Sequence, residues 1–110
     1  MKKFVLLFLL ALSPMAAHAE CGQASYYGPG LHGGVTANGE RFDQYAMTAA
    51  HPYQRLNSYV NVTHNGKTIR VKISDRGPYT GGRVLDLSYG AFAALASPSS
   101  GVINVCIAKS

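Results

Sequence analysis

The chain has few of the residue types and motifs that mark common functional classes. Its 110 residues include no tryptophan, two cysteines and five acidic side chains. No second Cys or His lies at ligand spacing from either cysteine, which argues against a metal site or thiol catalysis there. The longest apolar run, 4–12, is far shorter than the roughly 20 residues of a membrane-spanning helix. The basic residues are dispersed and no aromatic-basic recognition motif is present, so nucleic acid is a poor candidate partner.

The first nineteen residues have the organisation of a secretory signal peptide. Lys2 and Lys3 precede an apolar core, and 17–19 (Ala-His-Ala) is a small-x-small cleavage site. A retained membrane anchor is the alternative. We therefore expect residues 1–19 to be removed and residues 20–110 to be periplasmic or secreted, soluble and without a membrane anchor.

Residues 20–110 are enough for one small domain. Without Lys2 and Lys3, eight basic residues stand against five acidic ones, a net charge of +3. This modest positive charge suits a polyanionic partner such as the cell wall. Cys21 and Cys106 lie at the two ends of the segment, and an even cysteine count in an exported protein predicts a disulfide. Such a bridge would contribute about 4 kcal/mol to stability.

Strand periodicity dominates the rest of the chain. Apolar residues alternate with polar ones over 60–63 and 69–73, and the Asn65-Gly66 pair between these runs is a strong hairpin signal. Further strands are expected at 23–27 and 102–108, the latter with Cys106 on the face opposite its isoleucines. One helix is expected over 89–96, with Ser88 as its N-cap. Many short strands with Gly-rich connections and one short helix predict a small closed β-barrel.

Three of the five carboxylates lie in two turn-rich segments. Glu40 and Asp43 belong to Thr-Ala-Asn-Gly-Glu-Arg-Phe-Asp (36–43), which Thr-Ala-Ala-His (48–51) soon follows, and Asp75 belongs to Ser-Asp-Arg-Gly-Pro (74–78). Carboxylates that serve solubility are usually scattered over strand and helix faces. Here each segment also carries an arginine, and His51 is close in sequence. The pattern indicates a functional site.

These segments resemble the rare lipoprotein A family. The resemblance also includes Ala-Ser-Tyr-Tyr-Gly (24–28), Met47, Tyr79, Gly-Arg (82–83) and Leu-Asp-Leu-Ser (85–88), all in the family's order. It implies a six-stranded double-psi β-barrel, similar to the catalytic domain of expansins. It also implies a monomeric lytic transglycosylase without cofactor or metal. Such an enzyme cuts peptidoglycan glycan strands between N-acetylmuramic acid and N-acetylglucosamine and leaves an anhydro-muramoyl end.

The chemistry requires a group that protonates the leaving oxygen and then accepts a proton from the muramoyl C6 hydroxyl, which attacks in place of water. We expect Asp75 to be this acid/base, because it directly follows the 69–73 strand and matches a catalytic candidate of the wider family. The alternative is a turn residue that caps backbone amides. Arg76 complicates the assignment, since an adjacent cation lowers a carboxyl pKa.

Glu40, Asp43 and His51 are the other expected catalytic residues, as substrate hydrogen-bonding groups or support for the developing cation. Their alternatives are local: amide caps or pairing with Arg41 for the two acids, and a satisfied core histidine for His51. The expected substrate-binding residues, whose tyrosines would stack on sugar rings, are Tyr27, Arg76 and Tyr79. Asp86 is expected to pair with Arg83 or cap the helix.

The sequence departs from the family pattern at 54–58. The family has Leu-Pro-x-Gly-Thr shortly after its histidine, where this chain has Gln-Arg-Leu-Asn-Ser. Asn57 is expected to adopt the left-handed conformation that the glycine supplies. Two other functions stay open: a non-catalytic expansin-like module that binds or loosens the wall, and a secreted interaction protein such as an inhibitor.

Overall fold

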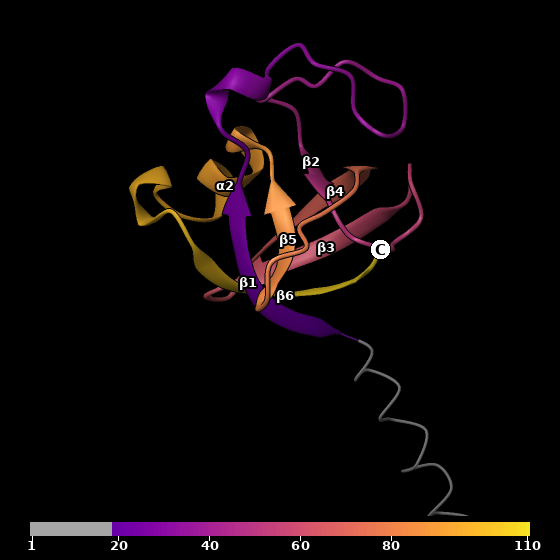
Figure 1. The fold of residues 1–110 in the computed structure, drawn as a ribbon. Helices are drawn as coiled ribbons and strands as arrows, with labels where there is room; N and C mark the ends of the chain where they lie inside the picture. Colours follow the sequence, from indigo (N-terminus) through magenta and orange to yellow (C-terminus); the bar gives the residue numbers. More distant parts are fainter. Residues whose placement is uncertain (1–18) are drawn as a thin grey trace, which may run out of the picture.

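Six strands close into a barrel in the computed structural model, which describes residues 19–110 (Figure 1). In chain order they are β1 (Glu20–Tyr26), β2 (Thr48–Ala50), β3 (Tyr59–His64), β4 (Lys67–Asp75), β5 (Arg83–Leu87) and β6 (Ile103–Lys109). Around the barrel the order is β1-β5-β2-β4-β3-β6, closing back onto β1. The β1–β5 and β2–β4 pairs are parallel and the others antiparallel. The predicted closed barrel is confirmed, whereas the predicted signal peptide, apart from Ala19, lies outside the described residues.

The β3–β4 hairpin forms where the alternation predicts it. Val60 and Val62 of β3 pair with Val71 and Ile69 of β4. Both β3 valines are buried in the core, while Asn61 between them is half-buried. The turn uses positive φ angles at Asn65 (49°) and Gly66 (80°), which match the twist of the two strands.

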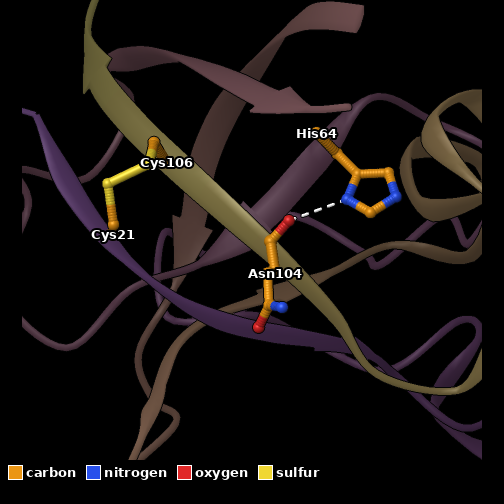
Figure 2. The surroundings of a disulfide bond; sticks show 4 residues. All are labelled: Cys21, His64, Asn104 and Cys106. Carbon is orange, nitrogen blue, oxygen red and sulfur yellow. Dashed lines mark hydrogen bonds between the residues drawn. A yellow bond between two sulfur atoms is a disulfide. The ribbon is translucent and has the colours of Figure 1, made fainter. Parts of the chain in front are cut away.

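The disulfide is a clip on the outside of the barrel, joining both ends of the domain (Figure 2). Cys21 of β1 and Cys106 of β6 stand directly opposite each other in the antiparallel pair. The β6 residues on the other face, Ile103, Val105 and Ile107, are buried in the core. A hydrogen bond of 2.7 Å between His64 Nδ1 and the Asn104 carbonyl joins β3 to β6. The predicted disulfide and its outward position are confirmed.

One short helix, α2 (Tyr89–Leu95), packs on the barrel through Ala91, Phe92 and Leu95. Ser88 caps it as predicted, because its hydroxyl accepts from the Ala91 amide at 3.1 Å. Two single-turn 3-10 helices, η2 (Pro29–Leu31) and η3 (Pro98–Ser100), lie in the connections. Within residues 19–110, no helix has the length and apolar character to cross a membrane.

The long connection between β1 and β2 rises above one end of the barrel and is drawn in purple (Figure 1). A single bridge between Val35 and Arg41 folds it back on itself. Phe42 from this connection, Tyr27 and Ala50 form a second, smaller apolar cluster, separate from the main core. This cluster places the first turn-rich segment next to the ends of β2 and β4, where the second one begins.

Candidate functional site

Asp75 is the last residue of β4, and both of its carboxylate oxygens are engaged. Oδ1 accepts from the backbone amides of Ala37 and Arg76, each at 3.0 Å. Oδ2 accepts from the Tyr27 hydroxyl at 3.2 Å. The amide contacts are those of the turn-capping alternative, so Asp75 caps backbone groups with one oxygen and turns the other towards Tyr27. All three partners are donors, which is the arrangement that suits an ionised carboxylate.

Tyr27 is nearly buried between this carboxylate and the loop above it. Its ring stacks on Phe42, with centroids 4.6 Å apart. Burial raises the pKa of the Tyr27 hydroxyl far above its ordinary value, and the negative charges of Asp75 and Asp86 raise it further. The hydroxyl is therefore a permanent hydrogen-bond donor to Asp75 over the range in which proteins are studied.

Arg76 points away from the carboxylate beside it. Its guanidinium Nη1 donates to the carbonyl oxygens of His51 at 3.1 Å and of Gln54 at 2.6 Å. These carbonyls belong to the segment that follows β2. The arginine thus holds the 51–54 turn against the end of β4, and its charge is directed to backbone oxygens instead of Asp75.

His51 is fully buried, and both of its ring nitrogens have partners. Nδ1 accepts from the amides of Tyr53 and Gln54, each at 3.1 Å. The proton therefore lies on Nε2, which donates to Glu20 Oε1 at 2.8 Å. Only the backbone faces the site, with the His51 amide donating to the Asp75 carbonyl at 3.2 Å. The side chain has the environment of the satisfied core histidine.

Glu40 and Asp43 lie in the turn-rich loop, as expected. Glu40 does not pair with Arg41, but with Lys72 Nζ at 2.9 and 3.1 Å. Hydrogen bonds from Lys72 and then Asn38 lower the pKa of this exposed carboxyl below its ordinary value. Asp43 Oδ1 accepts from the Tyr45 amide at 2.9 Å, which is a local cap.

Two small hollows lie beside Asp75, Glu40 and Asp43. The first, about 80 Å³, is lined by Asp75 with Tyr27, Leu31, Gly34, Val35, Thr36 and Phe42. The second, about 230 Å³, is lined by Glu40, Asp43, Arg41, Ala46, Thr48, Lys72 and Ser74, and again by Thr36 and Phe42. Thr36 and Phe42 line both, so the hollow with Asp75 and the hollow with Glu40 and Asp43 are neighbours. Larger hollows lie beside the disulfide and beside β3, but no Asp or Glu residue lines them.

Tyr79, the remaining expected substrate-binding residue, differs from the buried Tyr27, and the expected conformation of Asn57 can also be checked. Tyr79 lies in the loop after β4 with 79% of its surface exposed, free to meet a ligand. Asn57 has φ 69°, so the expected left-handed conformation is confirmed. Its side-chain oxygen accepts from Asn38 Nδ2 at 3.0 Å. This bond joins the departing 54–58 stretch to the loop that carries Glu40.

Asp86 is the residue that the sequence interpretation placed outside the site. It lies on β5, where it and Asp75 of β4 both pair with Ala50 of β2. Burial raises the pKa of the Asp86 carboxyl, with a smaller rise from Asp75, although the Ser25 hydrogen bond and Arg83 oppose the shift. The expected Arg83 pairing is indirect: Ser25 donates to Asp86 at 3.2 Å and accepts from Arg83 at 2.8 Å.

One feature of the sequence around Asp86 could have identified it as a candidate site residue. It stands in the Leu-Asp-Leu-Ser block, between two leucines that are fully buried in the core. An acid at the centre of a short apolar strand projects from the opposite face of the sheet, beside its neighbours' polar groups. Among residues 19–110, no group of three or more His, Cys, Asp or Glu residues is placed to hold a metal ion.

Comparison with known protein families shows to which family the chain belongs. The family described as lytic transglycolase matches residues 19–107, nearly the whole described domain. This chain belongs to that family. Its six-stranded closed barrel is accordingly the double-psi β-barrel that the resemblance implied.

Curated relatives of this lytic transglycolase family are similar over the same domain. The chain is 57% identical over 88 residues to the probable endolytic peptidoglycan transglycosylase RlpA of Synechocystis, covering 78% of this chain and 27% of the relative. It is 48% identical over 90 residues to the endolytic peptidoglycan transglycosylase RlpA of Vibrio cholerae, covering 80% and 34%. The chain therefore spans about a third or less of the length of these relatives.

Solved structures share the barrel. A Streptomyces papain inhibitor is 31% identical with a TM-score of 0.67, over 83% of this chain and 92% of that protein. A mutant of the Clavibacter michiganensis expansin, solved in complex with cellohexaose, is 23% identical with a TM-score of 0.67, over 84% and 50%. At that lower identity the likeness to the expansin concerns the fold alone.

Proposed function

We propose that the protein is a lytic transglycosylase that cleaves peptidoglycan glycan strands and leaves anhydro-muramoyl ends. The observation that carries the proposal is the pair of aspartates, Asp75 and Asp86, on either side of Ala50 with different environments. Two carboxyl groups with different surroundings can divide the acid and base steps of glycosidic cleavage between them. Membership of the lytic transglycolase family supports the same activity.

Asp75 has the surroundings of a base. Its three hydrogen-bond partners are donors, and the Arg76 guanidinium is turned away, so no ion pair with Arg76 occupies the carboxylate. In the proposed reaction it accepts the proton of the muramoyl C6 hydroxyl as that oxygen attacks C1. Its negative charge also stabilises the oxocarbenium-like centre that forms as the glycosidic bond breaks.

Asp86 has the surroundings of an acid. Burial favours its neutral form, and the charge of Asp75 acts in the same direction. It is the group from which the leaving oxygen draws its proton. This assignment divides between two carboxyls the work that was predicted for Asp75 alone. In the proposal, Glu40 and Asp43, which line the neighbouring hollow, supply hydrogen bonds to the sugars, and the exposed Tyr79 supplies stacking.

His51 acts as a positioning residue in this proposal. Its ring holds the amides of Tyr53 and Gln54, and its carbonyl holds Arg76. The His51 side chain thereby fixes the turn that keeps the guanidinium away from Asp75, although the ring itself lines neither of the two hollows.

The proposed transglycosylase activity is tested with purified sacculi. The protein is incubated with them, and the soluble products are analysed by mass spectrometry for anhydro-muramoyl fragments. Such fragments support the proposal. Retained binding to sacculi without any fragments would instead support the alternative, a non-catalytic wall-binding module with an expansin-like fold.

An inhibitor is the second candidate. The specific observation is the papain inhibitor from Streptomyces, of which this chain covers 92% at 31% identity. The test is a papain assay with a chromogenic peptide substrate. Dose-dependent inhibition at stoichiometric amounts, without release of glycan fragments from sacculi, would favour this candidate.

Export is proposed from the organisation of residues 1–19, and the site of action is then the periplasm or the medium. Glu20 would be the first residue of the mature chain, where its side chain already holds His51. Mass spectrometry of the protein recovered from each cell fraction tests this. A mature chain that begins at Glu20 supports export, and an uncleaved chain would contradict it.

A further inference from the structure

A second groove lies beside the 51–58 segment. It has a volume of about 920 Å³. Its lining comes from that segment, from β3 and β4, and from the end of β6: Tyr53, Gln54, Arg55, Ser58, Tyr59, Arg70, Lys109 and Ser110. The mechanism proposed above uses none of these side chains.

The groove is strongly basic. Arg55, Arg70 and Lys109 are exposed and come from three different parts of the chain. No Asp or Glu side chain is part of the lining. Glu20 is the nearby acid, since it raises the pKa of the Tyr53 hydroxyl, but its carboxylate is already paired with His51. Three of the eight basic side chains of residues 20–110 therefore gather where a carboxylate-bearing ligand would be neutralised.

Two tyrosines give the groove surfaces for a sugar ring. Tyr53 is 69% exposed, and its ring stands edge-on against the buried His51 ring, which fixes its orientation. The Arg70 guanidinium lies 3.9 Å from the centroid of the Tyr59 ring, and Arg70 Nε donates to Ser110 Oγ at 2.8 Å. A stacked and hydrogen-bonded arginine is held in place before a ligand arrives, which reduces the entropy lost on binding.

The 51–58 segment links this groove to the surroundings of Asp75. Its His51 and Gln54 carbonyls hold Arg76, whose amide donates to Asp75, and Asn57 is bonded to the Glu40 loop. Tyr53 and Arg55 of the same segment line the groove. The segment is also where the chain departs from the family's Leu-Pro-x-Gly-Thr pattern, and that departure supplies Arg55.

We propose that this groove binds a carboxylate-bearing part of the same glycan strand that is cut at Asp75, so the inference rests on the proposed function. The tyrosines would take sugar rings, and the three cations would take carboxylates. Peptidoglycan offers carboxylates of two kinds: the lactyl group of muramic acid, which is free once its peptide is removed, and the stem peptide itself. The shared chemistry is a glycan with regularly spaced negative charges.

The test measures binding, not cleavage, in an Asp75→Asn background that leaves the glycan uncut. Co-sedimentation is measured with peptide-bearing sacculi, with amidase-treated sacculi and with chitin, which lacks carboxylates. The key variant is Arg55→Ala/Lys109→Ala, because neither side chain makes a hydrogen bond within the described residues. A charge-conserving Arg55→Lys/Lys109→Arg variant and Lys67→Ala, an exposed cation at the start of β4, are the controls.

We expect the Ala/Ala variant to bind sacculi about five- to tenfold more weakly, as the loss of two exposed ion pairs predicts. Both controls stay within about twofold of the parent, and chitin binds weakly throughout. Tighter binding to amidase-treated sacculi identifies the lactyl group, and weaker binding identifies the stem peptide. Unchanged binding by the Ala/Ala variant, an equal loss in Lys67→Ala, or equally tight binding to chitin overturns the proposal.

Different results would overturn the proposed transglycosylase activity and the proposed glycan-binding groove. Anhydro-muramoyl products from the protein with Asp75 intact, together with unchanged binding by the Ala/Ala variant, would overturn the groove and leave the activity standing. The selective loss of binding without any such products would overturn the activity and leave the groove as a glycan-binding site.

Discussion

Arg76 and Asp75 are adjacent in sequence, yet the guanidinium of Arg76 lies on the carbonyls of His51 and Gln54, not on the Asp75 carboxylate. The backbone amide of Arg76, by contrast, donates to Asp75 Oδ1 at 3.0 Å. One residue thus supports the carboxylate through its main chain while its charge is held elsewhere. Arg76, whose charge argued against an acid/base role for Asp75, therefore helps to position the Asp75 carboxylate.

Arg76→Ala should loosen the 51–54 turn. The substitution removes two charge-assisted hydrogen bonds but keeps the backbone amide on Asp75, so we expect a loss of about 1–2 kcal/mol in the free energy of unfolding. Denaturant titration measures it. Lys67→Ala, which removes an exposed cation from the first position of β4, is the control and should change stability by less than about 0.5 kcal/mol. An unaltered Arg76→Ala midpoint would show that the turn does not depend on the arginine.

His51→Ala should be among the most destabilising single changes in the barrel. It leaves the amides of Tyr53 and Gln54 without their acceptor in a buried site, and we expect a cost of about 3 kcal/mol. Glu20→Gln is the matched control, because an amide oxygen still accepts from Nε2, and it should cost less than about 1 kcal/mol. If His51→Ala folds with wild-type stability but is inactive, the ring acts on substrate and is not a positioning group.

Asp86 should make stability depend on pH in the direction set by its raised pKa. A carboxyl whose pKa is higher in the folded than in the unfolded chain favours folding while it is protonated, and that contribution is lost as pH rises. We therefore expect the stability of the wild type, relative to Asp86→Asn, to fall as pH rises above about 4, the ordinary value for aspartate. Unfolding curves of both proteins between about pH 3 and 8 measure the difference. A difference that stays constant across this range would contradict the assignment.

Gly90→Ala should destabilise the protein, although alanine is the better helix former. A Cβ at this position would lie 2.6 Å from the Tyr45 carbonyl oxygen, which is backbone and cannot move aside easily. The Gly90 amide also donates to the Gln44 carbonyl at 2.8 Å, so the helix and the loop before β2 are held together there. We expect a cost of about 1–3 kcal/mol by denaturant titration. Ala93→Gly, on the exposed side of the same helix, is the control, with a loss of about 1 kcal/mol from propensity alone.

Local signals predicted most of the fold. The alternation of apolar and polar residues predicted the β3–β4 hairpin, the Asn-Gly pair predicted its turn, and Ser88 was predicted as the helix cap. Strand ends were less well predicted: β1 begins at Glu20 instead of residue 23 because its first residues pair with β6. That pairing joins the two ends of the domain, and no local pattern encodes it.

The site was predicted in part. The two turn-rich segments do meet, since the Ala37 amide donates to Asp75, and Glu40, Asp43 and Asp75 line two neighbouring hollows there. The direction of Arg76 and the burial of the His51 ring depend on contacts between distant segments, which a linear pattern does not contain. Asp86 was missed for the same reason, since only the pairing of β5 and β4 with β2 brings it beside Asp75.

The most direct test of the central claim is the yield of anhydro-muramoyl products from sacculi, measured by mass spectrometry for wild type and Asp75→Asn. The asparagine oxygen keeps the hydrogen bonds from Ala37 and Arg76, so the barrel should stay folded while the general base is lost. We predict that product formation falls by about 10²- to 10⁴-fold, with unfolding transitions that remain cooperative. Product formation by Asp75→Asn at the wild-type rate would contradict the account.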